Sequence, residues 1–77
     1  MALIADADFS WSSPVTLAAD EVWQSRDGRV FVTTTASPSA DDGILLLETH
    51  AIQLSAGQQV RYRKEGRGAA LIVREVV

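Results

Sequence analysis

Short runs in which apolar and polar residues alternate fill most of this chain, and such runs predict half-buried β-strands. Two of them, Glu21–Arg26 and Arg29–Thr35, flank the dipeptide Asp27-Gly28. Asp-Gly between two alternating runs is the strongest short-range signal for a β-hairpin. The two-residue loop would place Trp23 opposite Val32, and we expect both side chains on the core face.

Further strands are predicted along the rest of the chain. They cover Val15–Ala19, Ile44–Glu48, Ala51–Leu54, Gln59–Lys64 and Ala69–Val77. The run at Ile44–Glu48 is continuously apolar, which is typical of a strand buried on both faces. About seven short strands at this spacing, with no convincing helix, predict an all-β fold, either a small antiparallel β-sandwich or a jelly-roll-like barrel.

Residues 1–13 are predicted to form an extended N-terminal arm, followed by a single β-domain over residues 14–77. Phe9 and Trp11 alternate with serines in the arm, as in a strand with one apolar face. Exposing these side chains to water is unfavourable. We therefore expect the arm to lie either on a neighbouring subunit or back on its own sheet.

The size of the chain favours a partner. A domain of 77 residues buries only about 60% of its unfolded surface and usually needs a disulfide, a metal or another subunit. The absence of cysteine and the single histidine exclude disulfides and the usual zinc site. Because 47% of the residues are hydrophobic, we expect a homo-oligomer that covers apolar surface. The alternative is an unusually dense monomer core.

Charge and hydropathy narrow the range of partners. The net charge of −3 argues against a protein that binds nucleic acid, which needs a basic face. No apolar run approaches the roughly 20 residues that span a bilayer, so we expect no membrane insertion. The absence of cysteine fits a cytoplasmic origin or a particle assembled in a bacterial cytoplasm.

Residues that could carry chemistry are few. His50 has no nucleophile or second acid arranged with it in the sequence, and we expect it to be an exposed turn residue. Asp41 and Asp42 precede a glycine but lack the further ligands of a calcium loop, so we interpret them as turn-forming. We predict no catalytic, cofactor-binding or metal-binding residues, no cofactor, and a protein that is not an enzyme.

Four residues are predicted to form a protein interface: Phe9, Trp11, Arg61 and Arg63. The two arginines project from one face of the strand Gln59–Lys64. They could be solvated, pair with acidic residues of a neighbouring subunit, or contact an anion such as nucleic acid. Trp11 could anchor the arm on a protein or stack on a sugar ring, and we favour the protein because tryptophan is common at the centres of protein interfaces. On this view Trp11→Ala weakens assembly and leaves the domain folded.

Four segments, Phe9–Leu17, Glu21–Trp23, Ala40–Leu46 and Leu54–Arg63, carry a resemblance to a class of proteins. With the arm included, the chain resembles small accessory structural proteins of tailed phages and of gene transfer agents, which are phage-like particles. Within that class it looks like a head-spike base protein, which forms a ring at a capsid vertex and anchors a fibre. A decoration protein or a tail-tip component fits nearly as well. The resemblance implies a virion structural protein, an oligomeric adaptor that contacts capsid, fibre or tail proteins.

A second resemblance concerns the strand rhythm of Gly43–Glu48 and Ile52–Arg63, which is similar to that of cupin and jelly-roll barrels. Cupins hold a metal with two or three histidines and a glutamate. This chain has only His50, so the resemblance implies topology and not the metal. It also leaves an alternative function open, a small cupin-like or lectin-like module that binds a sugar or another small ligand.

Overall fold

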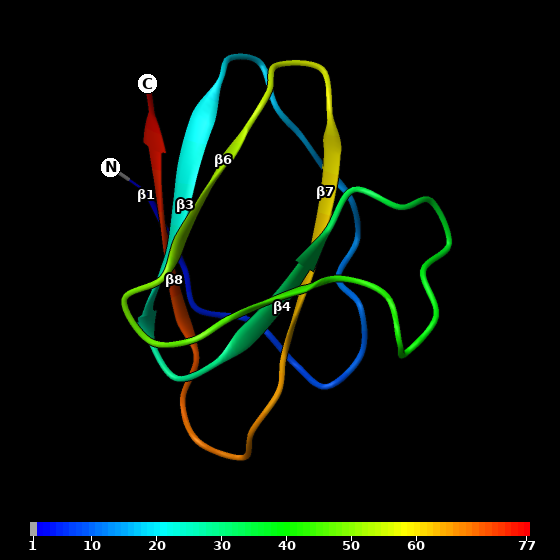
Figure 1. Cartoon of the computed structure of the whole chain (residues 1–77), viewed down its shortest axis with the longest axis vertical. Helices are drawn as coiled ribbons and strands as arrows, with labels where there is room; N and C mark the ends of the chain where they lie inside the picture. Colours follow the sequence, from blue (N-terminus) through cyan, green and yellow to red (C-terminus); the bar gives the residue numbers. More distant parts are fainter. Residues whose placement is uncertain (1) are drawn as a thin grey trace.

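The structure, a computed structural model, describes residues 2–77 and contains eight β-strands and no helix within them (Figure 1). The strands are β1 (Ala2–Ile4), β2 (Val15–Thr16), β3 (Glu21–Asp27), β4 (Val30–Thr33), β5 (Ile44–Leu46), β6 (Ala51–Leu54), β7 (Gln59–Lys64) and β8 (Leu71–Val76). The prediction of an all-β fold is confirmed.

The strands form two four-stranded antiparallel sheets that pack against each other. Sheet A has the order β1-β8-β3-β6, and sheet B has the order β2-β7-β4-β5. Within them the chain pairs in a nested pattern, since β1 pairs with β8, β2 with β7, β3 with β6 and β4 with β5. This rolled-up pairing over two sheets is the topology of a jelly roll. Of the two architectures expected, the chain therefore adopts a sandwich with jelly-roll connections.

The predicted hairpin at Asp27-Gly28 is wrong. β3 belongs to sheet A and β4 to sheet B, so the turn carries the chain around a corner from one sheet to the other. Trp23 lies opposite Ile52 and Arg74 instead of Val32. The turn signal specifies a reversal of the chain, but it does not decide which strands bond. Here β6 and β8 take both edges of β3, and the hydroxyl of Ser25 donates to the carbonyl of Gly28 across the corner (2.5 Å).

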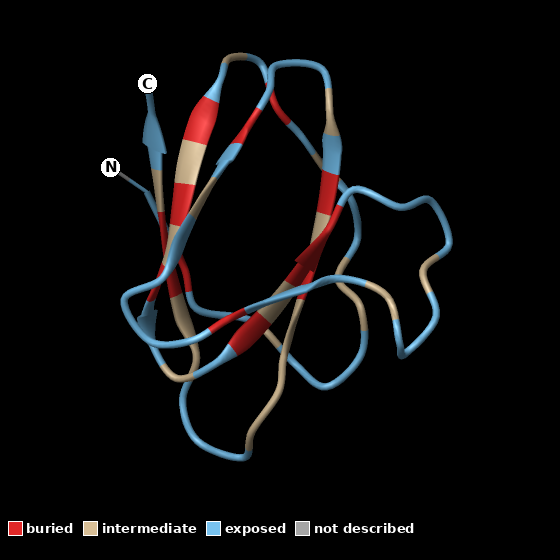
Figure 2. Cartoon of the chain, viewed as in Figure 1, coloured by how far each residue is buried: buried red, intermediate tan, exposed pale blue. Residues whose placement is uncertain are grey.

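The core lies between the sheets, as the buried stretches of β3, β4 and β7 show in Figure 2. Trp23 and Val32, the two side chains expected on the core face, are 0% and 1% exposed, which confirms that prediction. Trp23 and Tyr62 meet across the core, with ring centroids 6.2 Å apart. The buried core comprises Ile4, Leu17, Trp23, Val30, Val32, Leu46, Leu54, Val60, Tyr62 and Ile72.

The expectation that Ile44–Glu48 is a strand buried on both faces is wrong. β5 is the outermost strand of sheet B and bonds only to β4. Ile44 is 55% exposed, while Leu45 and Leu47 are each 40% exposed, and only Leu46 is buried. An uninterrupted apolar run therefore marks an edge strand whose apolar side chains find too few neighbours to cover them.

The described part of the arm folds back on its own domain, one of the two placements expected for it. β1 pairs with β8, so that Leu3 lies opposite Val73 and Ile4 opposite Ile72. Further along, the amide of Lys64 donates to the carbonyl of Asp8 (2.8 Å). Burial of Ile4 in the core stabilises this arrangement, because an extended arm alone would leave that side chain in water.

The corner at Gly28 gives a test of this topology. Gly28 has a φ of 72°, and a Cβ there would collide with the carbonyl oxygen of Ala69. Gly57 has a similar φ of 86° but open space around it. We expect Gly57→Ala to cost about 1–2 kcal/mol through backbone strain. Gly28→Ala should cost at least about 1 kcal/mol more through the clash. Urea denaturation measures both losses, and equal losses would contradict the tight packing of this corner.

Candidate functional site

The predicted interface residues of β7 lie on the outer face of sheet B. Val60 and Tyr62 point into the core and are buried, while Arg61 and Arg63 alternate with them and are half-buried. The prediction that the two arginines share the outward face of one strand is therefore confirmed. Both arginines, however, form hydrogen bonds to other segments of the same chain, Arg61 to Ser12 and Arg63 to Ala40.

Arg63 lies between two aromatic rings. Its guanidinium carbon is 4.2 Å from the ring centroid of Phe31 and 5.1 Å from that of Trp11. One terminal nitrogen donates to the carbonyl of Ala40 (2.7 Å), while Nε is buried without an acceptor. Aromatic faces attract a cation by about 0.5–2 kcal/mol each, and here they compensate for the missing hydrogen bond. We call Arg63, Phe31 and Trp11 the arginine sandwich.

Trp11 ties the arm to the connection between β4 and β5, which projects from the body of the molecule (Figure 1). Its indole Nε1 donates to the carbonyl of Ser39 (2.8 Å). The indole also lies against Gly43, where a Cβ would come within 2.8 Å of the ring. Trp11 is half-buried by these contacts. Phe9, in contrast, is 53% exposed, with only the ammonium of Lys64 over its ring at 4.9 Å.

Arg61 and Tyr62 hold the same region of the arm from two sides. Arg61 donates to the carbonyl of Ser12 (3.3 Å), and the Tyr62 hydroxyl donates to the carboxylate of Asp6 (2.6 Å). Burial, reinforced by the hydrogen bond to Asp6, raises the pKa of Tyr62 to about 12. The phenol is therefore a neutral donor over the physiological range. Sequence analysis missed Phe31, Tyr62 and Asp6 in this region, although the alternation of Phe31 with Val30 and Val32 marks it as outward-facing.

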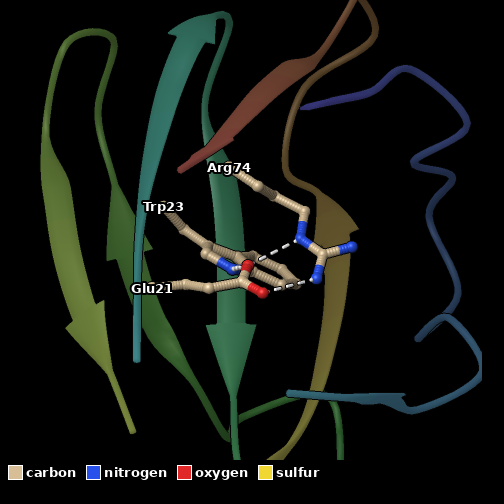
Figure 3. Close-up of polar contacts among 3 residues, drawn as sticks. All are labelled: Glu21, Trp23 and Arg74. Carbon is tan, nitrogen blue, oxygen red and sulfur yellow. Dashed lines mark hydrogen bonds and ion pairs between the residues drawn. The ribbon is translucent and has the colours of Figure 1, made fainter. Parts of the chain in front are cut away.

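A buried polar network at one end of the core was not predicted. Glu21 on β3 accepts two hydrogen bonds from Arg74 on β8, both 2.9 Å, in a bidentate ion pair (Figure 3). The indole Nε1 of Trp23 donates to the same carboxylate (2.9 Å). Arg74 also lies over the Trp23 ring, 5.1 Å from its centroid.

The network holds Glu21 in its ionised form. The hydrogen bonds from Arg74 lower the pKa of Glu21, with help from Trp23, and outweigh the opposing effect of burial. Both carboxylate oxygens are occupied, so the group is not placed to act as a proton donor. Its role is to join β3 and β8, the central pair of sheet A.

The remaining candidates for chemistry stand apart from one another. His50 is exposed in the turn before β6, and its Nδ1 accepts a long hydrogen bond from the amide of Leu47 (3.4 Å). Asp42 accepts from the amide of Ser39 (2.8 Å), which confirms its turn-forming role. Across residues 2–77, no three histidine, cysteine or acidic side chains come together as a metal site would require. In the same range no helix has the length and apolar character to cross a bilayer.

Two features of the surface are not covered by other parts of the described chain. Exposed apolar side chains include Leu3 (54% exposed) on edge strand β1 and Leu45 (40%) on edge strand β5, besides Val76 and Val77 at the C-terminal end. In addition, a cleft of about 460 Å³ opens between β4, β5 and β6. Comparison with family models, with curated proteins and with solved structures found no match to this chain. Its function is therefore argued from these surfaces.

The Glu21 network predicts a defined pH dependence of stability. At pH 7 we expect Glu21→Gln to lower the free energy of unfolding by about 2–3 kcal/mol, at or below the roughly 3–5 kcal/mol for a fully buried ion pair, because Arg74 is partly exposed. Because the pKa of Glu21 is lower when folded than its ordinary value of 4.5, this contribution is complete above pH 4.5. The contribution is lost as the pH falls through the lower pKa that Glu21 has in the folded protein. Denaturation in a series from pH 7 downward should show the stability difference between wild type and Glu21→Gln shrinking below pH 4.5, whereas the exposed Glu75→Gln should show no such difference.

Trp11 and Phe9 should differ in their effect on stability. Trp11→Ala removes the contacts with Arg63, Ser39 and Gly43, and we expect a loss of about 1–2 kcal/mol, below that for a fully buried tryptophan. Phe9→Ala should change stability by no more than about 0.5 kcal/mol, since its ring is mostly in water. Urea denaturation distinguishes the two. A Trp11→Ala variant as stable as the wild type would contradict an internal role for this side chain.

Proposed function

We propose that this chain is a non-enzymatic structural subunit that assembles through its sheet edges into a homo-oligomeric ring. In this proposal the ring acts as an adaptor in a phage-like particle, such as a head-spike base that anchors a fibre. The observation that carries the proposal is an exposed leucine on each of two edge strands, Leu3 on β1 and Leu45 on β5. Exposed apolar side chains beside unpaired strand edges are typical of surfaces that bind another chain.

The two edges are suited to a repeating contact because they lie at opposite corners of the sandwich. β1 ends sheet A, and β5 ends sheet B. Short connections join β3 to β4 and β5 to β6, so β5 and β6 share one side of the sandwich and β1 lies on the other. A contact between two different surfaces of successive copies forms a closed ring when the rotation between copies closes.

The particle role is supported by the sequence resemblance of Phe9–Leu17 and Leu54–Arg63 to accessory proteins of phage-like particles. Jelly rolls occur in viral capsid proteins, lectins and cupins, so the fold is compatible with this role but does not select it. The partners proposed are capsid, fibre or tail proteins of a particle assembled in a bacterial cytoplasm. The alternative, a module that binds a small ligand, is favoured by the cleft between β5 and β6.

Edge-to-edge assembly predicts the behaviour of two lysine variants in light scattering over a concentration series. The wild type should show one mass of defined stoichiometry. Leu3→Lys and Leu45→Lys should each abolish the ring, because each places an ammonium in the apolar contact at one of the two edges. Gln53→Lys on β6, an edge outside the proposed contact, serves as the matched control and should assemble normally.

Mixing the two variants identifies the type of contact. Each variant keeps one intact edge, so an equimolar mixture of Leu3→Lys and Leu45→Lys should form a heterodimer that cannot extend. A contact between identical surfaces would give no such product. A wild-type chain that stays monomeric over the whole series would contradict self-assembly. Particles purified from the bacterium that encodes this chain should contain the protein, and its absence from them would contradict the particle role.

A further inference from the structure

An isoleucine that faces the inside of the sandwich is left uncovered. Ile44 on β5 lies opposite Val32 on β4, and residues directly opposite each other on paired strands share a face. Val32 is 1% exposed in the core, yet Ile44 is 55% exposed. Leu46, two residues further along the same face, is 4% exposed. The space between the sheets is therefore open at the beginning of β5.

Sheet A forms the opposite wall of this opening. Ile52 and Leu54 on β6 lie opposite Trp23 and Glu21, which places them on the inner face of that sheet. Together with Val32 and Ile44 they line the cleft of about 460 Å³. That volume falls within the roughly 300–1,000 Å³ typical of small-molecule sites and is too small for a folded partner.

The cleft is lined by uncharged residues. The chain carries seven basic and ten acidic residues, and none of them lines this cleft. The rim carries hydroxyl and amide groups from Thr34, Thr35, Ser55 and Gln58. The side-chain oxygen Oε1 of Gln58 accepts from the backbone amide of Ser55 (2.7 Å), and this leaves the side-chain NH₂ of Gln58 as a donor. The hydroxyl of the buried Thr33 accepts from the amide of Thr35 (3.1 Å), whereas the side chains of Thr34 and Thr35 are exposed at the rim.

We propose that this cleft binds an uncharged amphiphile, a small molecule with an aliphatic portion and hydroxyl groups. The aliphatic portion covers the inward-facing Ile44 and the half-buried Ile52, and the hydroxyl groups bond to Thr34 and Gln58 at the rim. A charged ligand would lose hydration without gaining an ionic partner. The cleft takes the inward-facing Ile44 of β5, whereas Leu45 of the proposed assembly contact points to the outer face of the same strand.

Titration with n-hexyl β-D-glucoside below its micelle concentration tests the site by NMR of the full chain. We expect saturable shifts confined to resonances of Thr34, Ile44, Ile52 and Gln58. Glucose has the hydroxyl groups without the alkyl chain, and hexanol has the alkyl chain without the sugar. Each should bind at least about tenfold more weakly than the glucoside. Hexanoate should bind more weakly than hexanol, because the cleft offers no cation. No saturable shift with the glucoside would overturn the site, and tighter binding of hexanoate would overturn the uncharged class of ligand.

Two variants locate the binding. Ile44→Trp fills the cleft from its inner face and should abolish the shifts, while Leu47→Trp adds the same ring at an exposed position that does not line the cleft and should leave the affinity unchanged. Thr34→Val keeps the shape of the side chain but removes its hydroxyl, and should weaken glucoside binding about fivefold with little effect on hexanol. This variant decides the question if Ile44→Trp does not fold. Unchanged glucoside affinity in a folded Ile44→Trp, or in Thr34→Val, would overturn the placement of the ligand.

Discussion

The pairing of β8 with β3 is the interaction on which the rest of the structure depends. It joins the last strand of the chain to the third and leaves the other edge of β8 to bind β1, so it also places the arm. Ile72 enters the core from β8, and Arg74 reaches the Glu21 carboxylate beside Trp23 (Figure 3). Because breaking a buried ion pair costs more than forming one gains, this network discourages other registers of the two strands.

The open edges and the cleft have a common physical origin. A two-sheet jelly roll of this size has four edge strands, and strands as short as β1 and β5 present few side chains to the core. Leu3 and Leu45 point to the outer faces of their sheets beside unpaired backbone, and Ile44 points into a gap between the sheets. These are the places where the chain itself leaves apolar surface uncovered, and both the assembly and the ligand site that we propose would cover it.

The arginine sandwich changes the role of the residues first selected for an interface. Arg63 lies over the rings of Trp11 and Phe31, so both Arg63 and Trp11 make their main contacts within the subunit. They fasten the arm and the β4–β5 connection to the outer face of sheet B. This is a way for a chain without disulfides or a metal site of the usual kind to stabilise a long connection. Phe9 keeps an exposed ring and remains available to a neighbour.

The sequence by itself determined the strands and the direction of many side chains. Alternation placed Trp23 and Val32 inward and Arg63 outward, because side-chain direction along a strand is a local property with a period of two. The tertiary structure alone decided which strands pair. Thus Asp27-Gly28 became a corner between sheets, and the apolar run at Ile44 became an exposed edge. Pairing and exposure depend on contacts between residues far apart in the chain, and a local pattern does not contain them.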